Sequence, residues 1–205
     1  MKDTLREILD FAGSLFDVVG IIERPDYGTL IVFGLESTTE RNLDLYGRKD
    51  GRTVLSGFEK HMSPPLESAL SFIRGKGYKA EPVGRCGYPL QSQLNLKELA
   101  IQMGLGQRGK HSVVLHDKYG PRLRFAAIQI GASFHLPAAP ARKELDNPTC
   151  QGCTLCLDVC PVNILEPYKM TDTSRCLSRM LTMKEQQGHL VPCDECLKVC
   201  PTGTD

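Results

Sequence analysis

The first apolar stripe of the chain falls at helical spacing, because its members recur three or four positions apart. It consists of Leu5, Ile8, Leu9, Ala12 and Phe16. The helix is expected to end at Gly13 or soon after. Two strands are predicted next, at residues 17–22 and 27–35, since both segments are short apolar runs and the second is rich in β-branched side chains.

The pattern then becomes polar before it turns helical again. Residues 37–57 are polar and rich in glycine, so they are predicted to form a loop or lid. A helix is predicted to begin at Pro64, with Ser63 as its cap, and to end at Gly75 or Gly77. Its buried face is expected to comprise Leu66, Ala69, Leu70 and Ile73.

Further helical and extended segments complete the first two thirds of the chain. A helix is predicted over residues 95–103. Strands at 112–116 and 123–130 are expected to form a hairpin, because a turn-rich segment joins them. Residues 131–147 have the composition of a connector. Helices and strands are therefore mixed, which predicts an α+β fold.

Composition limits the class of protein. The chain has 205 residues, 41% of them hydrophobic, which is enough for one sizeable core beside a smaller module. Its 25 basic and 24 acidic residues give a formal charge of +1, so no overall charge attracts nucleic acid or a membrane surface. No apolar run approaches the roughly 18 residues of a membrane span. Nine cysteines without a signal-peptide pattern predict a cytoplasmic protein.

Eight of the nine cysteines lie in two sets near the carboxy terminus. The first set reads C-x2-C-x2-C-x3-C-P from Cys150, and the second repeats the C-x2-C-x3-C-P ending from Cys193. In bacterial ferredoxins the fourth cysteine of such a run binds the other 4Fe-4S cluster. We therefore assign cluster one to Cys150, Cys153, Cys156 and Cys200, and cluster two to Cys160, Cys176, Cys193 and Cys196.

Two other uses of these cysteines fit the pattern less well. Zinc knuckles would need pairs of C-x2-C, and the triple run with C-P endings suits iron better. A disulfide framework belongs to secreted chains, and residues 1–30 lack the apolar core of a signal peptide. Two 4Fe-4S clusters are the prediction.

A glycine-rich stretch is the second informative segment. Gly104, Gly106 and Gly109 allow close approach of the backbone to a ligand, and Lys110 can meet an anion. The stretch follows a helix and enters a strand, the reverse of a dinucleotide-binding fingerprint. A tight helix-to-strand turn and a binding loop both remain open. The same region is rich in basic residues, for which a solvated charged face and a phosphate-binding surface are both open. They are Arg108, Lys110, Lys118, Arg122 and Arg124.

Together these stretches resemble the catalytic core of epoxyqueuosine reductases, cobalamin-dependent iron-sulfur enzymes related to reductive dehalogenases. The resemblance is carried by residues 16–21, the loop 104–112, the double set of cysteines and the segment 176–182. It implies a nitroreductase-like α/β core over residues 1–140. A ferredoxin-like module with two 4Fe-4S clusters would follow over residues 141–205.

The resemblance also implies a corrinoid and suggests which residues contact it. The candidates to line the cobalamin are Leu105, Gly106, Gly109, Lys110, His111 and Ser178. The family usually has asparagine where His111 stands, and its general acid is an aspartate upstream of the glycine loop. The corresponding residues 85–91 contain no carboxylate. Tyr88 and Cys86 are the candidate proton donors by position, although Cys86 is also explained as a free structural thiol.

Two functions are compatible with these features. One is a small reductase in which the clusters deliver electrons to a cobalamin that acts on a small-molecule or corrinoid substrate. The other is an electron-transfer protein that reduces a partner or its cofactor. A donor such as a ferredoxin or flavodoxin is expected in both cases. The sequence ends five residues after Cys200, without the helical-repeat domain through which many family members hold tRNA, so a tRNA substrate is not expected.

Overall fold

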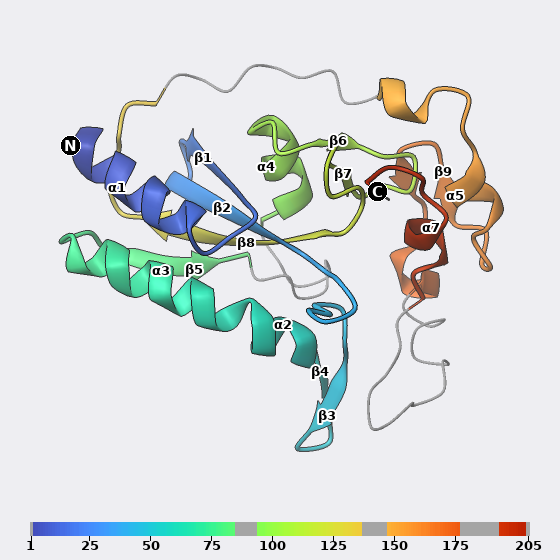
Figure 1. Cartoon of the computed structure of the whole chain (residues 1–205), viewed down its shortest axis with the longest axis horizontal. Coiled ribbons are helices and arrows are strands. Elements are labelled where there is room, and N and C mark those ends of the chain that lie inside the picture. The colour runs from blue at the N-terminus through green and yellow to red at the C-terminus, as the bar shows by residue number, and fades with distance from the viewer. Residues whose placement is uncertain (1, 85–93, 137–146, 177–192, 204–205) are drawn as a thin grey trace. The chain divides into compact units, whose positions relative to one another are not determined.

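The computed structural model describes residues 2–84, 94–136, 147–176 and 193–203 (Figure 1). Helices and strands are mixed along the chain, which confirms the α+β class. The chain forms two compact units, each built from several segments. The sheet unit comprises Met1–Glu36, Glu59–Leu105 and Arg124–Arg142, and the cysteine unit comprises Ser37–Phe58, Gly106–Leu123 and Lys143–Asp205. The division at residue 140 stays a prediction.

The sheet unit is built on a four-stranded sheet. Its strands, in spatial order, are β1 (Val18–Arg24), β2 (Gly28–Glu36), β8 (Leu123–Ile130) and β5 (Ala80–Val83). β1 and β2 form an antiparallel pair in which Ile21 lies opposite Ile31, so the first two predicted strands are confirmed. β5, which the sequence reading did not predict, pairs antiparallel with β8.

Both faces of β2 are covered, because every residue from Thr29 to Leu35 is buried. Side chains alternate between the two faces of a strand. On one face the ring of Phe33 packs against Phe16, with centroids 4.5 Å apart. On the other face Gly20 of β1 lies opposite Val32 of β2, and a Cβ on Gly20 would lie 3.0 Å from the side chains of Leu105 and Met103.

Three helices pack against this sheet or against one another. They are α1 (Lys2–Gly13), α3 (Ser63–Gly75) and α4 (Leu96–Gln102). α1 and α3 lie side by side through stacked rings of Phe11 and Phe72, whose centroids are 4.1 Å apart (Figure 1). α4 begins at Leu96 and is capped by Asn95, whose side chain accepts a hydrogen bond from the Glu98 backbone N–H, so a sequence-local cap fixes its start.

The start of α3 corrects one prediction. Its buried face is the predicted one, formed by Leu66, Ala69, Leu70 and Ile73. Ser63, however, is the first helical residue and not the cap, because Met62 holds the capping position and no side chain caps the helix there. A short helix, α2 (Ser56–His61), comes directly before it.

Residues 37–57 are more ordered than the predicted loop. They contain a hairpin of β3 (Gly47–Lys49) and β4 (Arg52–Val54). Its two turn residues, Asp50 and Gly51, both have positive φ, 52° and 74°. This is the geometry of a tight two-residue hairpin turn, for which Asp-Gly is a favoured sequence. The prediction of a loop over residues 37–57 was therefore wrong, although the Asp50-Gly51 dipeptide indicates a hairpin turn.

The predicted hairpin of residues 112–116 with 123–130 is also wrong. β7 (Val114–Leu115) pairs with β6 (Gln107–Arg108), so the glycine-rich stretch folds back on itself. The later strand, β8, pairs within the four-stranded sheet instead. Each strand of the β6–β7 pair has two residues, too few for hydrophobic alternation to reveal the partner.

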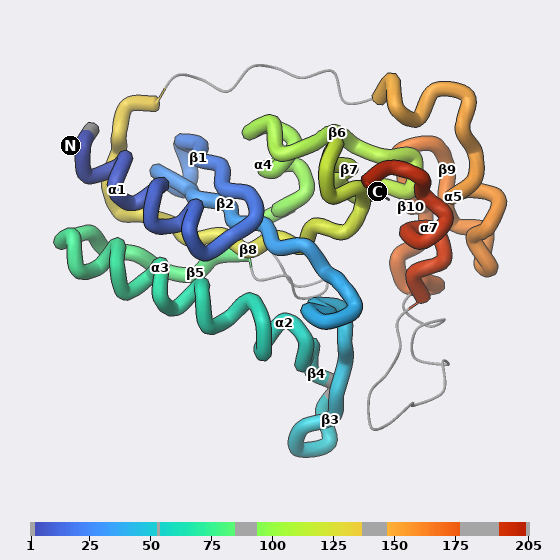
Figure 2. Tube along the Cα trace, in the orientation of Figure 1, coloured from blue at the N-terminus to red at the C-terminus, as the bar shows by residue number. Residues whose placement is uncertain are grey.

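The cysteine unit is built from short elements, which Figure 2 traces in orange and red along its carboxy-terminal segment. They are the 3-10 helix η1 (Pro148–Cys150), the helices α5 (Leu155–Asp158) and α7 (Glu195–Lys198), and a hairpin of β9 (Leu165–Glu166) with β10 (Lys169–Met170). α5 and α7 pack against each other. None of the helices in the described ranges has the length and apolar character needed to cross a bilayer.

Candidate iron-sulfur site

The helices α5 and α7 are structural repeats. In α5 the backbone N–H of Leu157 donates to Thr154 O at 2.8 Å, and in α7 Leu197 donates to Asp194 O at the same distance. Each helix carries one cysteine and is followed by another. Cys156 and Cys196 lie within the helices, and Cys160 and Cys200 follow them, each donating its backbone N–H to the leucine carbonyl at 3.3 Å.

The first group of thiols joins the two ends of the cysteine segment. Burial raises the pKa of Cys156 to about 11, and the charges of Cys150, Cys153 and Cys200 add to the rise. Burial likewise raises the pKa of Cys150, with further increases from Cys200 and Cys153. These four sulfurs are therefore close enough to interact, although Cys200 comes from the opposite repeat. They are the residues assigned to cluster one.

The second group has the mirrored composition. Burial raises the pKa of Cys196 to about 12, and the charges of Cys176, Cys193 and Cys160 raise it further. The pKa of Cys176 is raised by burial and then by Cys193 and Cys160. Cys160 is the member that comes from the first repeat. These are the four residues assigned to cluster two.

The donor set has the chemistry that an iron-sulfur cluster requires. All eight of these cysteines are free thiols. Crowding of buried sulfurs keeps thiols protonated, whereas bound iron stabilises the thiolates, so cluster assembly releases protons and is favoured as pH rises. Among the described residues, no group of three or more His, Cys, Asp or Glu side chains is spaced to hold a single metal ion. A four-iron cluster separates its ligands more widely than one ion does.

Lys110 links the glycine-rich stretch to the first group of thiols. Its Nζ donates to the carbonyl of Cys153 at 2.8 Å. Its backbone N–H donates to the sulfur of Cys150, a contact that lowers the pKa of that thiol and opposes the effect of burial. Its own carbonyl accepts from the Tyr168 backbone N–H at 3.2 Å. The lysine predicted to meet an anion is thus engaged with the cysteine segment.

The glycines of this stretch are required by its own packing. A Cβ on Gly109 would lie 2.3 Å from the ring of His111, which is 2% exposed. A Cβ on Gly106 would lie 2.6 Å from Val114 and 2.8 Å from the carbonyl of Leu115, and its φ is +142°. These contacts favour the tight-turn interpretation of the glycines. Leu105 and Gly106 remain partly exposed.

Asn147 is a structural residue of the site that the sequence reading missed. Its side-chain oxygen accepts from the Thr149 backbone N–H at 3.0 Å and so caps η1, while its Nδ2 donates to the carbonyl of Arg108 at 3.1 Å. It is 5% exposed. The signal was available, because asparagine before proline is a typical start of a helical turn. Asn147 joins β6 to the first cysteine of the set.

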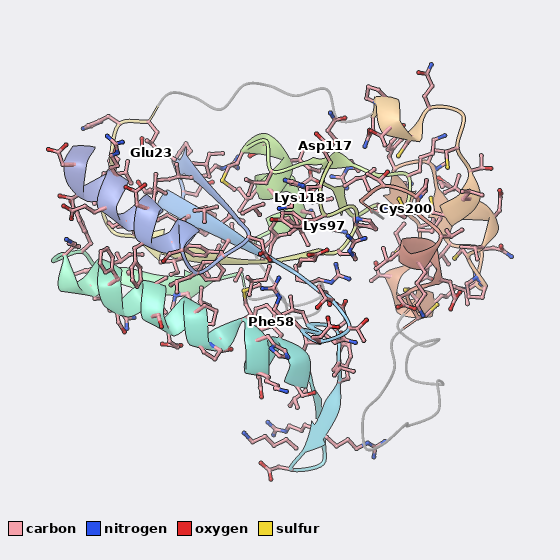
Figure 3. The ribbon with its side chains drawn as sticks, in the orientation of Figure 1. Glu23, Phe58, Lys97, Asp117, Lys118 and Cys200 are labelled. Carbon is pink, nitrogen blue, oxygen red and sulfur yellow. The ribbon has the colours of Figure 1, made fainter. Side chains whose placement is uncertain are left out.

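The other basic residues of the predicted surface differ in exposure, since Arg108, Arg122 and Arg124 are half-buried and Lys118 is exposed. Arg122 is half-buried and donates from Nη2 to the carbonyl of Gly203, whereas Lys118 is exposed and lies over the ring of Tyr119. Figure 3 labels Lys118 and Cys200 on the side-chain view. The candidate proton donors Tyr88 and Cys86, and Ser178 of the proposed cobalamin contacts, lie outside the described residues.

Comparison with known proteins agrees with this site. Residues 149–203 match the 4Fe-4S double cluster binding domain. An epoxyqueuosine reductase of Alicycliphilus denitrificans is 31% identical over 184 residues, which cover 73% of this chain and 49% of the relative. A tetrachloroethene reductive dehalogenase of Dehalobacter restrictus is 31% identical over 141 residues, 69% of this chain and 24% of the relative. The chain thus spans half or less of the length of these relatives.

Solved structures give the same fold. A crystal structure of an epoxyqueuosine reductase superimposes with a TM-score of 0.69 at 16% identity, covering 98% of this chain and 66% of the other. A catabolic reductive dehalogenase gives a TM-score of 0.71 at 16% identity, covering 97% of this chain and 31% of the other. The eight cysteines, the two-cluster domain at residues 149–203 and the shared fold agree with one another, and the chain is similar to epoxyqueuosine reductases and reductive dehalogenases.

Proposed function

We propose that this chain is an iron-sulfur reductase in which two 4Fe-4S clusters pass electrons, one at a time, to a corrinoid. The observation that carries the proposal is the sorting of eight thiols into two groups of four, each with one member from the opposite repeat. This is the ligand exchange found in two-cluster ferredoxins. Two adjacent clusters form a path for single electrons.

The two groups are adjacent within the cysteine unit. Cys156 of the first group is among the charges that raise the pKa of Cys196 in the second, after burial and the members of its own group. The contact between α5 and α7 brings these two helical cysteines together. Clusters held at these positions would share a protein wall, and thiolate-bound clusters change little in geometry on reduction. The arrangement therefore suits electron transfer between them.

The corrinoid is supported by the relatives and by part of the glycine-rich stretch. One reductive dehalogenase structure in this fold is described as suggesting a mechanism for B12-dependent dehalogenation. In this chain the residues available to such a group are Leu105 and Gly106, which are partly exposed, whereas Lys110 and His111 are engaged in packing. A bound corrinoid would supply the reductive chemistry, and the protein would supply position and electrons.

The substrate and donor are proposed only as chemical classes. A small molecule or another corrinoid is the proposed substrate, and an electron-donor protein such as a ferredoxin or flavodoxin is the proposed source of electrons. One epoxyqueuosine reductase is known in complex with a modified tRNA stem loop. That substrate is not proposed for this chain, because the sequence similarity covers only 49% of the length of the Alicycliphilus denitrificans relative.

A second candidate function is an electron-transfer protein without substrate chemistry of its own. One sequence observation favours it. An epoxyqueuosine reductase of Bacillus subtilis is described as having a catalytic loop that carries an aspartate. Residues 85–91 of this chain, which correspond by resemblance to the segment of the general acid, contain no carboxylate. A carrier needs the clusters but no proton donor.

Anaerobic preparation followed by titration with cob(II)alamin separates the two functions. About eight iron atoms and about eight sulfides per chain are expected, four for each of two clusters. A perturbed cobalt absorption spectrum, followed by cobalt reduction when dithionite is added, supports the reductase. Full iron content without a change in the cobalt spectrum supports the electron-transfer protein. Zinc in place of iron in oxygen-free material contradicts both functions.

A further inference from the structure

Lys110 makes three contacts with the cluster-binding segment, and all of them lie within the cysteine unit. Its backbone N–H reaches the sulfur of Cys150, and its Nζ reaches the carbonyl of Cys153 at 2.8 Å. Its carbonyl accepts from Tyr168. Both cysteines belong to the first group of thiols. A residue distant in sequence is therefore fixed beside the position of cluster one.

The acceptor of the Lys110 ammonium is neutral. A backbone carbonyl orients the side chain but does not cancel its positive charge. Lys110 is half-buried, so water screens that charge less than on an exposed lysine. The ammonium lies within hydrogen-bond distance of the backbone of Cys153, so its charge stands beside a ligand of the first group. Any species that adds negative charge at this position is stabilised by the same field.

Lys198 provides a contrast beside the second group. It lies in α7, close enough to Cys193 to interact with its charge. Its Nζ forms a salt bridge with Asp194 at 2.7 Å, and its side chain is 63% exposed. The carboxylate and the solvent both offset its positive charge. Each thiol group therefore has a lysine beside it. Asp194 offsets the charge of Lys198, whereas the backbone carbonyl that binds Lys110 leaves its charge in place.

We propose that Lys110 is a positioning residue that raises the reduction potential of cluster one selectively. Reduction of a 4Fe-4S cluster adds one electron and transfers no atom, so the reduced form carries more negative charge. A nearby cation and an N–H donor directed at a ligand sulfur stabilise that form. Cluster one then accepts electrons from cluster two, which lacks this contribution from Lys110.

The inference rests on the two-cluster part of the proposed function and is independent of the corrinoid. The test is a redox titration followed by electron paramagnetic resonance, with dithionite as the reductant that is itself oxidised to sulfite. Wild type is compared with Lys110→Met, Lys110→Gln and Lys110→Arg. Lys198→Met is the control for loss of a lysine beside the other cluster. Cys153→Ala identifies which signal belongs to cluster one.

The neutral variants are expected to lower the potential of cluster one by about 59 mV, which corresponds to a tenfold change in a one-electron equilibrium constant. Cluster two should keep its potential in these variants. Lys110→Arg should stay close to wild type, because it retains the charge. Lys198→Met should leave both potentials nearly unchanged, because Asp194 and solvent already offset that lysine.

Several results would overturn the proposal. One is an unchanged cluster-one potential in a neutral variant with full iron content. Equal shifts of both clusters, or a shift in Lys110→Arg as large as that in Lys110→Met, would mean that Lys110 acts only through packing. If Lys110→Met loses iron, Lys110→Gln decides the matter, since its amide is still a hydrogen-bond donor. Absence of iron in wild type would instead contradict the two-cluster assignment.

Discussion

Gly120 lies directly against Thr202, so closely that a Cβ on the glycine would stand 2.1 Å from the threonine carbonyl oxygen. Gly120 has a φ of 55° and pairs with His116 through two backbone hydrogen bonds, of 2.8 and 3.0 Å. Arg122, two residues on, donates to the carbonyl of Gly203. The turn at residues 116–120 therefore fixes the chain immediately after Cys200, the thiol that the second repeat supplies to the first group.

Gly120→Ala is expected to reduce occupancy of cluster one. The methyl group would push the 201–203 segment away and displace Cys200, because a carbonyl oxygen cannot approach a Cβ so closely. Iron content should fall from about eight toward about four atoms per chain, since only one cluster depends on Cys200. The measurement is iron analysis after anaerobic reconstitution, with electron paramagnetic resonance to identify the lost signal.

Gly51→Ala is the matched control. Gly51 also has a positive φ, 74°, but nothing lies within 4 Å of the position where its Cβ would be. It carries the same kind of backbone strain without the collision. Its iron content should equal that of wild type. An equal loss of iron in both variants would show that general destabilisation is responsible and not the contact with Thr202.

The exchange of cysteines between the repeats predicts which substitutions share a phenotype. Cys153→Ala and Cys200→Ala should abolish the same paramagnetic signal, although the two residues lie at opposite ends of the segment. Cys160→Ala and Cys193→Ala should abolish the other. Each variant should retain about four iron atoms per chain. If Cys200→Ala instead matches Cys193→Ala, each repeat holds its own cluster and the exchange is wrong.

The sequence indicates a double-cluster domain, which the family model at residues 149–203 matches, but it does not indicate the strand pairing around that domain, for a physical reason. Cluster ligands are set by short spacings such as C-x2-C and x3-C-P, which can be read without knowing the fold. The pairing of β6 with β7 depends on two residues in each strand, and no periodicity exists over so short a length.

Contacts of high sequence separation were equally out of reach. The bond from Lys110 to Cys153 joins segments more than forty residues apart, and neither residue type predicts it. Local chemistry was more informative. The Asp50-Gly51 turn and the Asn147-Pro148 cap both follow from dipeptide preferences, so the hairpin within residues 37–57 and the structural role of Asn147 are both indicated by the sequence.

Gly109 and His111 should show strong coupling in a double-mutant cycle. Gly109→Ala places a methyl group where the imidazole ring of His111 lies, 2.3 Å away, and is expected to cost about 1–3 kcal/mol of stability. In the background of His111→Ala the same substitution should cost much less, because the ring is gone. Chemical unfolding followed by circular dichroism measures both. Additive effects would mean that the ring moves aside freely.

Glu23 in β1 holds the segment that follows β8, and its stabilising effect should depend on pH. Its Oε1 accepts from Ser133 Oγ at 2.7 Å and from the Phe134 backbone N–H at 2.6 Å, while Oε2 accepts from Leu136 N–H at 3.0 Å. Figure 3 labels this side chain at the edge of the sheet unit. These bonds, led by that of Ser133, lower the pKa of Glu23 from 4.5 to about 2.

A carboxyl group whose pKa is depressed by folding stabilises the protein above its ordinary pKa, and this contribution is lost as pH falls toward the folded value. Glu23→Gln should therefore lower the unfolding temperature at pH 7. The amide has only one oxygen to accept hydrogen bonds, and its NH2 group would face a backbone N–H that also donates. The difference in unfolding temperature between the variant and wild type should narrow as pH falls below 4.5 toward about 2.

Any effect of acid on the clusters is common to both proteins and cancels in the comparison. Glu81→Gln, at an exposed position in β5, removes the same charge without touching the bonds to residues 133–136 and is the matched control. A difference that stays constant with pH would mean that packing, and not the charge of Glu23, holds the segment.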